Sequence, residues 1–198
     1  MAEKQMALEI ADLAIKVVGF SATAISLLFT AKQLRVANLW KRKEFANNSI
    51  TRFFQDPLVR NAMLMLDWRE RILVLSAEHS EMLGKTTLNY SQDMLPSALR
   101  KGLGFSDDEI VIRDCFDAFF GGIQQFNDLV ECGIMEYSDF TPYFVYWGKI
   151  LTGEIDHKSR ESLDAIHDYI NIFFDPKQTN KFFQNVMGDS QLEVTSRP

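Results

Sequence analysis

Arg160 and His167 are the two residues of this chain whose types and spacing best suit chemistry. They lie seven positions apart in SRESLDAIHD, which is nearly two helical turns, so both side chains point to one side of a helix. A histidine can exchange a proton with a ribose 2′-hydroxyl or a leaving oxygen, and an arginine can hold a phosphate. The structural alternative is that both residues pair with nearby acids on a solvated face, such as Asp156, Asp164 and Asp168.

The sequence carries no other catalytic motif. A phosphate-binding loop, a dinucleotide fingerprint and a nucleophile elbow are all missing, and no Cys or His cluster has the spacing of a metal site. Cys115 and Cys132 lie on one predicted helix, about 25 Å apart along its axis, which is beyond disulfide reach. We therefore expect no metal, no cofactor and no intrachain disulfide bond.

A second pattern lies in the N-terminal stretch DLAIKVVGFSATAISLLFTAKQ, which is uncharged from Val17 to Ala31. Its small and polar residues recur at alternating intervals of four and three, which makes one stripe along a helix. In a membrane such a stripe lets helices pack closely, and it can also line a water-filled path. It predicts packing against copies of the same helix around an opening, through Lys16, Gly19, Thr23, Ser26 and Thr30.

The length of this helix does not decide whether it crosses a membrane. Residues 17–31 span about 22 Å, whereas a bilayer core is about 30 Å thick. The flanks favour crossing, because five basic residues follow the run before the first acid, and a basic excess marks the cytoplasmic side. These residues, which would face anionic headgroups, are Lys32, Arg35, Lys41, Arg42 and Lys43.

In that orientation the N-terminus lies outside the inner membrane and the main domain lies in the cytoplasm. The alternative is a soluble amphipathic helix whose narrow wet face is the polar stripe. A cleaved signal peptide is disfavoured, because the small residues of Ala22–Ala24 lie inside the apolar run rather than after it.

The bulk numbers describe an ordinary globular chain. Its 198 residues suit one domain plus an N-terminal helix, and its formal net charge of -6 argues against general binding to nucleic acid. The paired phenylalanines in RFFQ, AFFG, IFFD and KFFQ indicate core packing rather than ligand sites.

The predicted class is all-α, with the N-terminal helix in residues 1–33, a helical bundle in 34–187 and a disordered tail in 188–198. SDDE at 106–109 is a capping box that opens a helix to Cys132, and Gly121 and Gly122 mark a kink or a close helix crossing. Further helices are predicted to start at Pro57, at Pro142 with Thr141 as cap, at about Ser159 and after Pro176. No strand is expected, and residues 76–105 are predicted to be a long connection with a short helix near 96–101.

The spacing of Arg160 and His167 matches the Arg-x(4–6)-His pattern of higher-eukaryote and prokaryote nucleotide-binding (HEPN) ribonucleases, which resemble this chain in being all-helical. The order of features also resembles a group of small bacterial membrane proteins with one N-terminal helix. It includes QLRVANLWKRKEF, then FFQDPLVRNAMLMLDW, then IRDCFDAFFGGIQQFNDLVECGIMEYSDFTPYFVYW. The nearest function is that of the accessory membrane protein of type VI-B CRISPR systems, with a divergent HEPN-like domain and an oligomeric membrane pore.

That resemblance implies a non-enzymatic, homo-oligomeric effector of antiphage defence that forms a gated pore and depolarises the membrane. Its implied partners are copies of itself, the lipid bilayer, and a nucleotide, an oligonucleotide or a CRISPR effector as trigger. Two alternatives stay open: a ribonuclease that uses Arg160 and His167, and a membrane-tethered scaffold for another protein.

Overall fold

The structure is a computed structural model that describes the backbone of residues 2–195 and the side chains of residues 26–188. The chain forms two compact units, Met1–Glu44 and Phe45–Pro198, and each is described by itself. Helix α1 (Ala2–Gln55) supplies the whole described part of the first unit and also enters the second. The predicted all-α class is confirmed, because helices make up most of the described chain.

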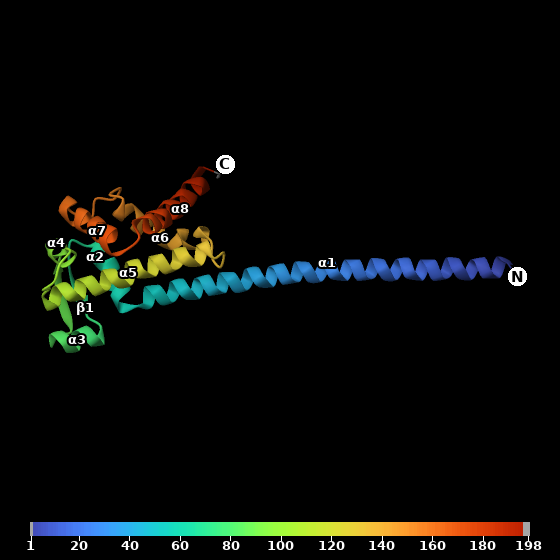
Figure 1. Cartoon of the computed structure of the whole chain (residues 1–198), viewed down its shortest axis with the longest axis horizontal. Coiled ribbons are helices and arrows are strands. Elements are labelled where there is room, and N and C mark those ends of the chain that lie inside the picture. Colours follow the sequence, from blue (N-terminus) through green and yellow to red (C-terminus); the bar gives the residue numbers. More distant parts are fainter. Residues whose placement is uncertain (1, 196–198) are drawn as a thin grey trace. The chain divides into compact units, whose positions relative to one another are not determined.

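The second unit holds the other elements in chain order (Figure 1). Its helices are α2 (Pro57–Asp67), α3 (Ala77–Leu83), α4 (Leu95–Ala98), α5 (Asp107–Glu131), α6 (Tyr137–Leu151), α7 (Arg160–Phe173) and α8 (Pro176–Thr195). A 3-10 turn, η1 (Gln92–Met94), precedes α4, and two strands, β1 (Glu70–Val74) and β2 (Thr87–Ser91), flank α3.

Helix α5 is the central element, and α2 and α8 both pack against it (Figure 1). Its start confirms the predicted capping box: the Ser106 hydroxyl accepts from the Glu109 N–H at 3.3 Å, and the Glu109 carboxylate accepts from the Ser106 N–H at 2.8 Å. The apolar side of α5 is fully buried at Phe116, Phe119 and Ile123. The local sequence therefore places this helix correctly.

Phenylalanines from α1, α6 and α8 meet those of α5 in the core. The pairs in RFFQ, AFFG and KFFQ pack there as predicted, whereas Phe173 of IFFD is exposed. The ring of Phe144 on α6 lies 5.5 Å from Phe182 on α8, 5.9 Å from Phe126 on α5 and 5.7 Å from Phe53 on α1, measured between centroids. Such tilted and edge-on pairs add about 0.5–1.5 kcal/mol each beyond their burial. This cluster holds α6 and α8 onto the rest of the unit.

The expectation that no strand occurs is wrong. Residues 70–74 and 87–91 form an antiparallel two-stranded sheet, with Ile72 opposite Asn89. The stretch 76–105 was predicted to be a long connection with one short helix near 96–101. The short helix is present as α4, but the stretch also holds α3, β2 and η1, which were not predicted. The apolar run of 72–75 is too short to show a period, so its pairing with a distant segment decides its structure.

The predicted start of a helix at Pro142 is also wrong. Helix α6 begins at Tyr137, because the Asp139 carboxylate accepts from the Glu136 N–H at 3.0 Å and closes an earlier first turn. Pro142 consequently lies inside the helix. The start at Pro57 is confirmed, with the Asp56 side chain accepting from the Leu58 N–H at 2.8 Å.

The predicted terminal features fall mostly outside the described side chains. The structure does not describe the side chains of residues 17–25 in the apolar run or of residues 189–198 in the predicted tail. Over the residues that the structure describes, no helix combines the length and the apolar character needed to cross a bilayer. Both the predicted span and the predicted disordered tail therefore stay predictions.

Candidate functional site

The described end of the first unit is an uninterrupted helix with large apolar side chains in solvent. Leu27, Leu28 and Phe29 are 66%, 72% and 62% exposed, and Leu34 and Trp40 are exposed as well. Burying one such side chain is worth about 1.5–3 kcal/mol. Successive helical residues point about 100° apart, so residues 27–29 present apolar surface around more than half of the helix.

Two residues of the predicted polar stripe have described side chains, and both are exposed. The Thr30 hydroxyl donates to the Ser26 carbonyl one turn earlier, at 2.9 Å. This bond satisfies the hydroxyl within its own helix, so the threonine needs no water. The side chains of Lys16, Gly19 and Thr23 lie outside the described residues, so the packing role of the stripe stays a prediction.

The predicted basic cluster follows these residues on the same helix. Lys32, Arg35, Lys41 and Lys43 are exposed, and Arg42 is half-buried. The positive charge therefore begins directly after the exposed apolar residues and continues along the helix.

Arg160 and His167 lie on one helix, α7, as their spacing predicted. Ser159 caps this helix, its hydroxyl accepting from the Ser162 N–H at 3.2 Å. The His167 ring donates from Nε2 to the Leu151 carbonyl of α6 at 2.7 Å. That carbonyl belongs to the last turn of α6, where no helical partner is available. His167 therefore ties α7 to the end of α6 and keeps Nδ1 as its free nitrogen.

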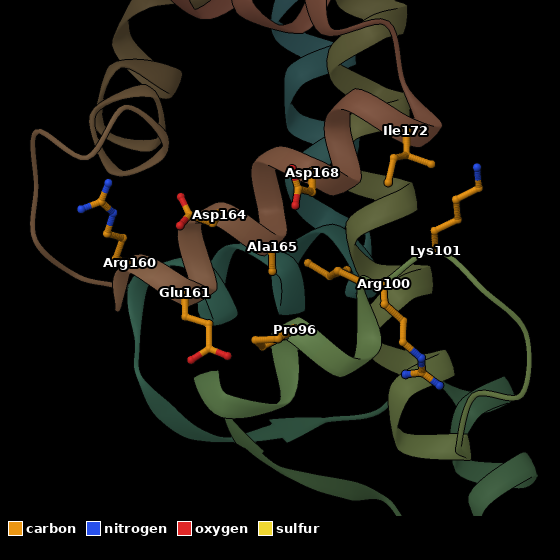
Figure 2. Close-up of a pocket in the computed structure, with 10 residues that line it drawn as sticks. Pro96, Arg100, Lys101, Arg160, Glu161, Asp164, Ala165, Asp168 and Ile172 are labelled. Carbon is orange, nitrogen blue, oxygen red and sulfur yellow. The ribbon is translucent and has the colours of Figure 1, made fainter.

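Arg160 lies instead at a pocket of about 570 Å³ between α4 and α7. In Figure 2, Arg160 is at one end of the lining residues and Lys101 is at the other, with Ala165 between them. Arg100 also lines the pocket, and three acids, Glu161, Asp164 and Asp168, balance the three bases. This balance disfavours a phosphate, because the acids repel it. His167 does not line the pocket, so the structure does not join the two predicted residues in one site.

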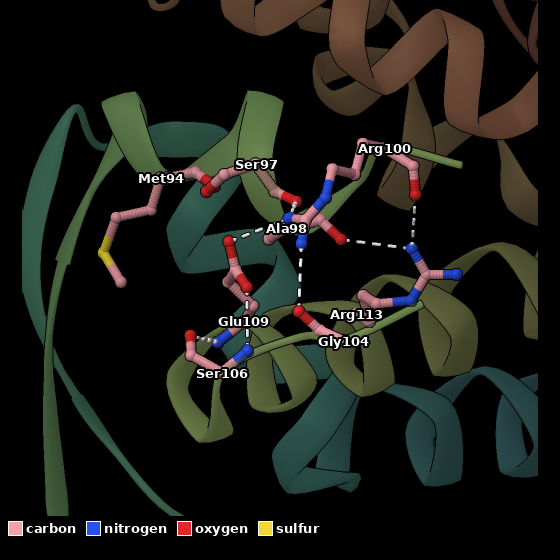
Figure 3. A network of polar contacts seen from close by, with 8 residues as sticks. All are labelled: Met94, Ser97, Ala98, Arg100, Gly104, Ser106, Glu109 and Arg113. Atoms are coloured by element: carbon pink, nitrogen blue, oxygen red, sulfur yellow. Dashed lines mark hydrogen bonds and ion pairs between the residues drawn. The ribbon is translucent and has the colours of Figure 1, made fainter. Parts of the chain in front are cut away.

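A network missed by the sequence analysis surrounds two other arginines at the start of α5 (Figure 3). Arg100 bonds Glu109 at 2.9 Å and the Gly104 carbonyl at 3.2 Å. The hydrogen bond from the Ser106 N–H, followed by smaller contributions from Ser97 and Arg100, holds the pKa of Glu109 below its ordinary value. Because its guanidinium has these internal partners, Arg100 stabilises the fold and is not available to bind a ligand in the pocket.

Arg113 joins the same network from α5. Its Nη1 donates to the Ala98 and Arg100 carbonyls at 3.1 and 3.0 Å (Figure 3). Its guanidinium carbon lies 4.4–4.9 Å from the ring centroids of Phe105, Tyr169 and Phe173. This cation is held by three rings and two carbonyls, which is an anchor for the turn after α4 rather than a ligand site.

Lys158 is a second feature that the sequence analysis missed. It is only 3% exposed, its Nζ donates to the Trp68 carbonyl, and it lies 5.6 Å from the Tyr90 ring centroid. Desolvation, and then the charge of Arg69, lowers the pKa of Lys158 to about 8. A strongly lowered lysine pKa is typical of reactive sites, but here the amine points to a backbone carbonyl at the end of α2.

Polar contacts next to Lys158 fasten the loop between α6 and α7. The Tyr146 hydroxyl bonds the Asp67 carboxylate and lies 3.3 Å from His157 Nε2. Burial, and then the bond to Asp67, raises the pKa of Tyr146 to about 12. Arg69 donates to the His157 carbonyl at 3.3 Å. The contacts of Lys158 and those of Tyr146 and His157 together hold this loop against the end of α2. The residues that make these contacts come from segments far apart in the chain, so their spacing in the sequence does not predict them.

In the described part of the chain, no group of His, Cys, Asp and Glu is placed to hold a metal ion. Cys115 is buried and Cys132 is exposed, and both are free thiols, as their predicted separation implied.

Comparison with protein-family models, curated proteins and solved structures found no match to this chain. Its function must therefore be inferred from its own residues.

Proposed function

We propose that this protein is a membrane-anchored, homo-oligomeric effector whose N-terminal helix enters the bilayer. The observation that carries the proposal is the exposure of the three consecutive residues Leu27, Leu28 and Phe29 on a continuous helix. One partner helix covers a single stripe, whereas these side chains point in three directions. Hydrocarbon covers all of them at once, so lipid is the best match for this surface.

The residues on either side support the same placement. The Thr30 hydroxyl has its partner within the helix, so it can enter hydrocarbon at little cost. The basic cluster of Lys32, Arg35, Lys41, Arg42 and Lys43 follows, and each charge near an anionic surface contributes about 1 kcal/mol. This order favours a cytoplasmic location for the basic cluster and for the helical domain that follows it in the chain.

Assembly into a gated pore is the second part of the proposal. Gly19, Thr23 and Ser26 lie on the stripe along which copies of the helix would meet, with Lys16 and Thr30 at its ends. The role in antiphage defence and the HEPN-like character of the helical domain rest on the resemblance in sequence layout. A nucleotide, an oligonucleotide or a CRISPR effector would then be the trigger.

Fractionation of the expressed full-length chain tests the anchor. The wild type should remain in the membrane after a carbonate wash. Leu28→Arg should lower retention, because a charge in the apolar segment costs up to about 2.5–3.5 kcal/mol, the value at the centre of a spanning helix. Asn47→Arg is the matched control, since it adds the same charge at an exposed position of the same helix. Release of the wild type by carbonate, or equal retention of both variants, would overturn the membrane anchor.

Ion flux through reconstituted vesicles tests the pore separately. The double variant Thr23→Leu with Ser26→Leu keeps the helix apolar, so it should stay in the membrane but lose flux. Unchanged flux would remove the proposed lining residues and leave the anchor standing. Light scattering of the detergent-solubilised protein should report a homo-oligomer, and a monomer would contradict the assembly.

The ribonuclease that uses Arg160 and His167 is the second candidate from the sequence. The bond from His167 to the Leu151 carbonyl gives this residue a structural task, and the acids around Arg160 oppose a phosphate. The ribonuclease function therefore stays a prediction. It would be favoured over the pore if the wild type cleaves RNA and a folded His167→Ala variant does not.

A further inference from the structure

The free edge of β1 is the feature from which we draw a new inference. Leu75 N–H bonds the Thr86 carbonyl at 3.0 Å, and Gln92 N–H bonds the Arg69 carbonyl at 2.7 Å. Bonded and non-bonded pairs alternate along an antiparallel ladder. The register thus makes Arg71–Tyr90 and Leu73–Leu88 bonded pairs. The main-chain groups of Glu70, Ile72 and Val74 then point away from β2.

One of these outward groups is already occupied. The Val74 carbonyl accepts from the Asn61 side-chain amide of α2 at 2.8 Å, and Asn61 is itself buried. The N–H groups of Ile72 and Val74 and the Ile72 carbonyl form no hydrogen bond with the described residues. These groups can therefore pair with an added strand, which is how a free sheet edge recognises an extended peptide.

The side chains along this edge are unusually apolar for solvent. Ile72 is 63% exposed and Val74 is 70% exposed, whereas Leu73, which alternates with them, is fully buried. Exposed β-branched residues on an open edge favour unwanted pairing, and edge strands are commonly protected against it. An added strand would cover both residues.

A groove of about 420 Å³ runs beside this edge between β1 and α2. Ile72 and Val74 form one side, Leu64 lies on the α2 side, and the charged residues that line it, Arg60 and Arg71, are both basic. The whole chain has a net charge of -6, so this local charge is opposite in sign to that of the molecule. A basic groove attracts acidic side chains.

We propose that the free edge of β1, with its groove, binds an extended acidic segment of a partner protein as an added strand. Main-chain bonds to Ile72 and Val74 give the affinity, and Arg60 and Arg71 select acidic side chains. This inference does not depend on the membrane proposal, since every residue that it uses lies in the helical unit.

The test uses the purified full-length chain and two short acetylated peptides, one alternating Glu with Val and the other Lys with Val. Fluorescence anisotropy should show binding of the acidic peptide and at least tenfold weaker binding of the basic one. Hydrogen exchange at the Ile72 and Val74 N–H groups should slow when the acidic peptide binds. Equal affinity for both peptides, or binding to neither, would overturn the proposal.

Two proline variants test which edge of the two-stranded sheet binds the peptide. Ile72→Pro removes one outward N–H from β1, and its matched control Asn89→Pro removes the outward N–H of the opposite residue on β2. Only Ile72→Pro should weaken peptide binding, by at least tenfold. Arg60→Glu, an exposed change on α2, should do the same and does not depend on the strand folding. If these variants bind like the wild type, or if Ile72→Pro changes the oligomeric state instead, an added peptide strand is the wrong occupant.

Discussion

Gly122 on α5 lies against the ring of Phe53 on α1 so closely that no side chain fits between them. A methyl group added at Gly122 would lie 2.3 Å from Cε2 and 2.6 Å from Cδ2 of Phe53. The ring has little freedom to move, because Phe126, Phe119 and Phe144 lie 5.1–5.8 Å from it, centroid to centroid. The paired glycines were predicted to mark a kink or a close helix crossing, and at Gly122 the structure shows a close contact with a ring from α1.

Gly122→Ala should consequently lower the free energy of unfolding by about 1–3 kcal/mol, the usual cost of overpacking. Gly121→Ala is the matched control: its added methyl group would meet nothing within 4 Å, so it should gain about 0.5–1 kcal/mol of helix propensity. Urea denaturation measures both variants. Equal effects of the two substitutions would contradict the close contact, and partial rescue of Gly122→Ala by Phe53→Leu would support it.

Lys158 should make stability rise with pH in the mildly alkaline range. Its pKa is about 8 in the folded chain against 10.5 for the ordinary side chain. Between these values the unfolded chain holds one more proton than the folded chain, so the free energy of unfolding increases with pH. The gain is at most about 1.4 kcal/mol per pH unit.

Urea denaturation of the wild type and of Lys158→Met at pH 7 and pH 9.5 checks this expectation. The wild type should gain about 2 kcal/mol relative to the variant across this interval. The range stops short of pH 10 because burial raises the pKa of Tyr90 and Tyr169. Those tyrosines lower stability once they ionise in the unfolded chain. Burial also raises the pKa of Cys115, but its effect is the same in the wild type and in Lys158→Met and cancels between them. Parallel pH profiles for wild type and variant would show that Lys158 titrates normally.

Replacing Arg113 with lysine should destabilise the folded chain. Its planar guanidinium donates to two carbonyls and stacks on three rings, and a lysine ammonium cannot reproduce both arrangements. We expect Arg113→Lys to lower the free energy of unfolding by about 2 kcal/mol. Arg160→Lys, at an exposed position, should change it by less than about 0.5 kcal/mol. A stability of Arg113→Lys equal to that of Arg160→Lys would refute the anchoring role.

His167→Ala should be mildly destabilising, by about 0.5–1 kcal/mol, because it leaves the Leu151 carbonyl without this partner. Arg160→Ala should be neutral or slightly stabilising, since a positive charge at the first position of a helix opposes the helix dipole. Thermal or urea denaturation distinguishes the two variants. If both keep wild-type stability and both lose RNA cleavage, the catalytic interpretation of the pair would replace the structural one.

Local sequence predicted the elements whose signals lie within a few residues. The capping box of Ser106 and Glu109 starts α5, and Pro57 after Asp56 starts α2, because each cap is closed by neighbours in the chain. The same reasoning failed at Pro142, where an earlier cap at Glu136 already begins the helix. Two competing local signals cannot be ranked without the packing of the helix that follows.

The strands were missed for a different reason. β1 and β2 are each five residues long, and each becomes a strand by pairing across an intervening helix. The alternation of buried Leu73 and Leu75 with exposed Ile72 and Val74 is a tertiary outcome, because all four residues are apolar. Hydrophobicity therefore could not show which of them face the core.

By itself the sequence determined the mainly helical class, the capped starts of α2 and α5, the phenylalanine core and the shared helix of Arg160 and His167. Each depends on composition or on contacts one or two turns long. Only the tertiary structure decided that His167 bonds the Leu151 carbonyl while Arg160 lines a pocket that does not include His167. It also decided that Lys158 is buried and that β1 keeps an open edge. Those features depend on segments far apart in the chain, and burial and partner choice are properties of their packing rather than of their order.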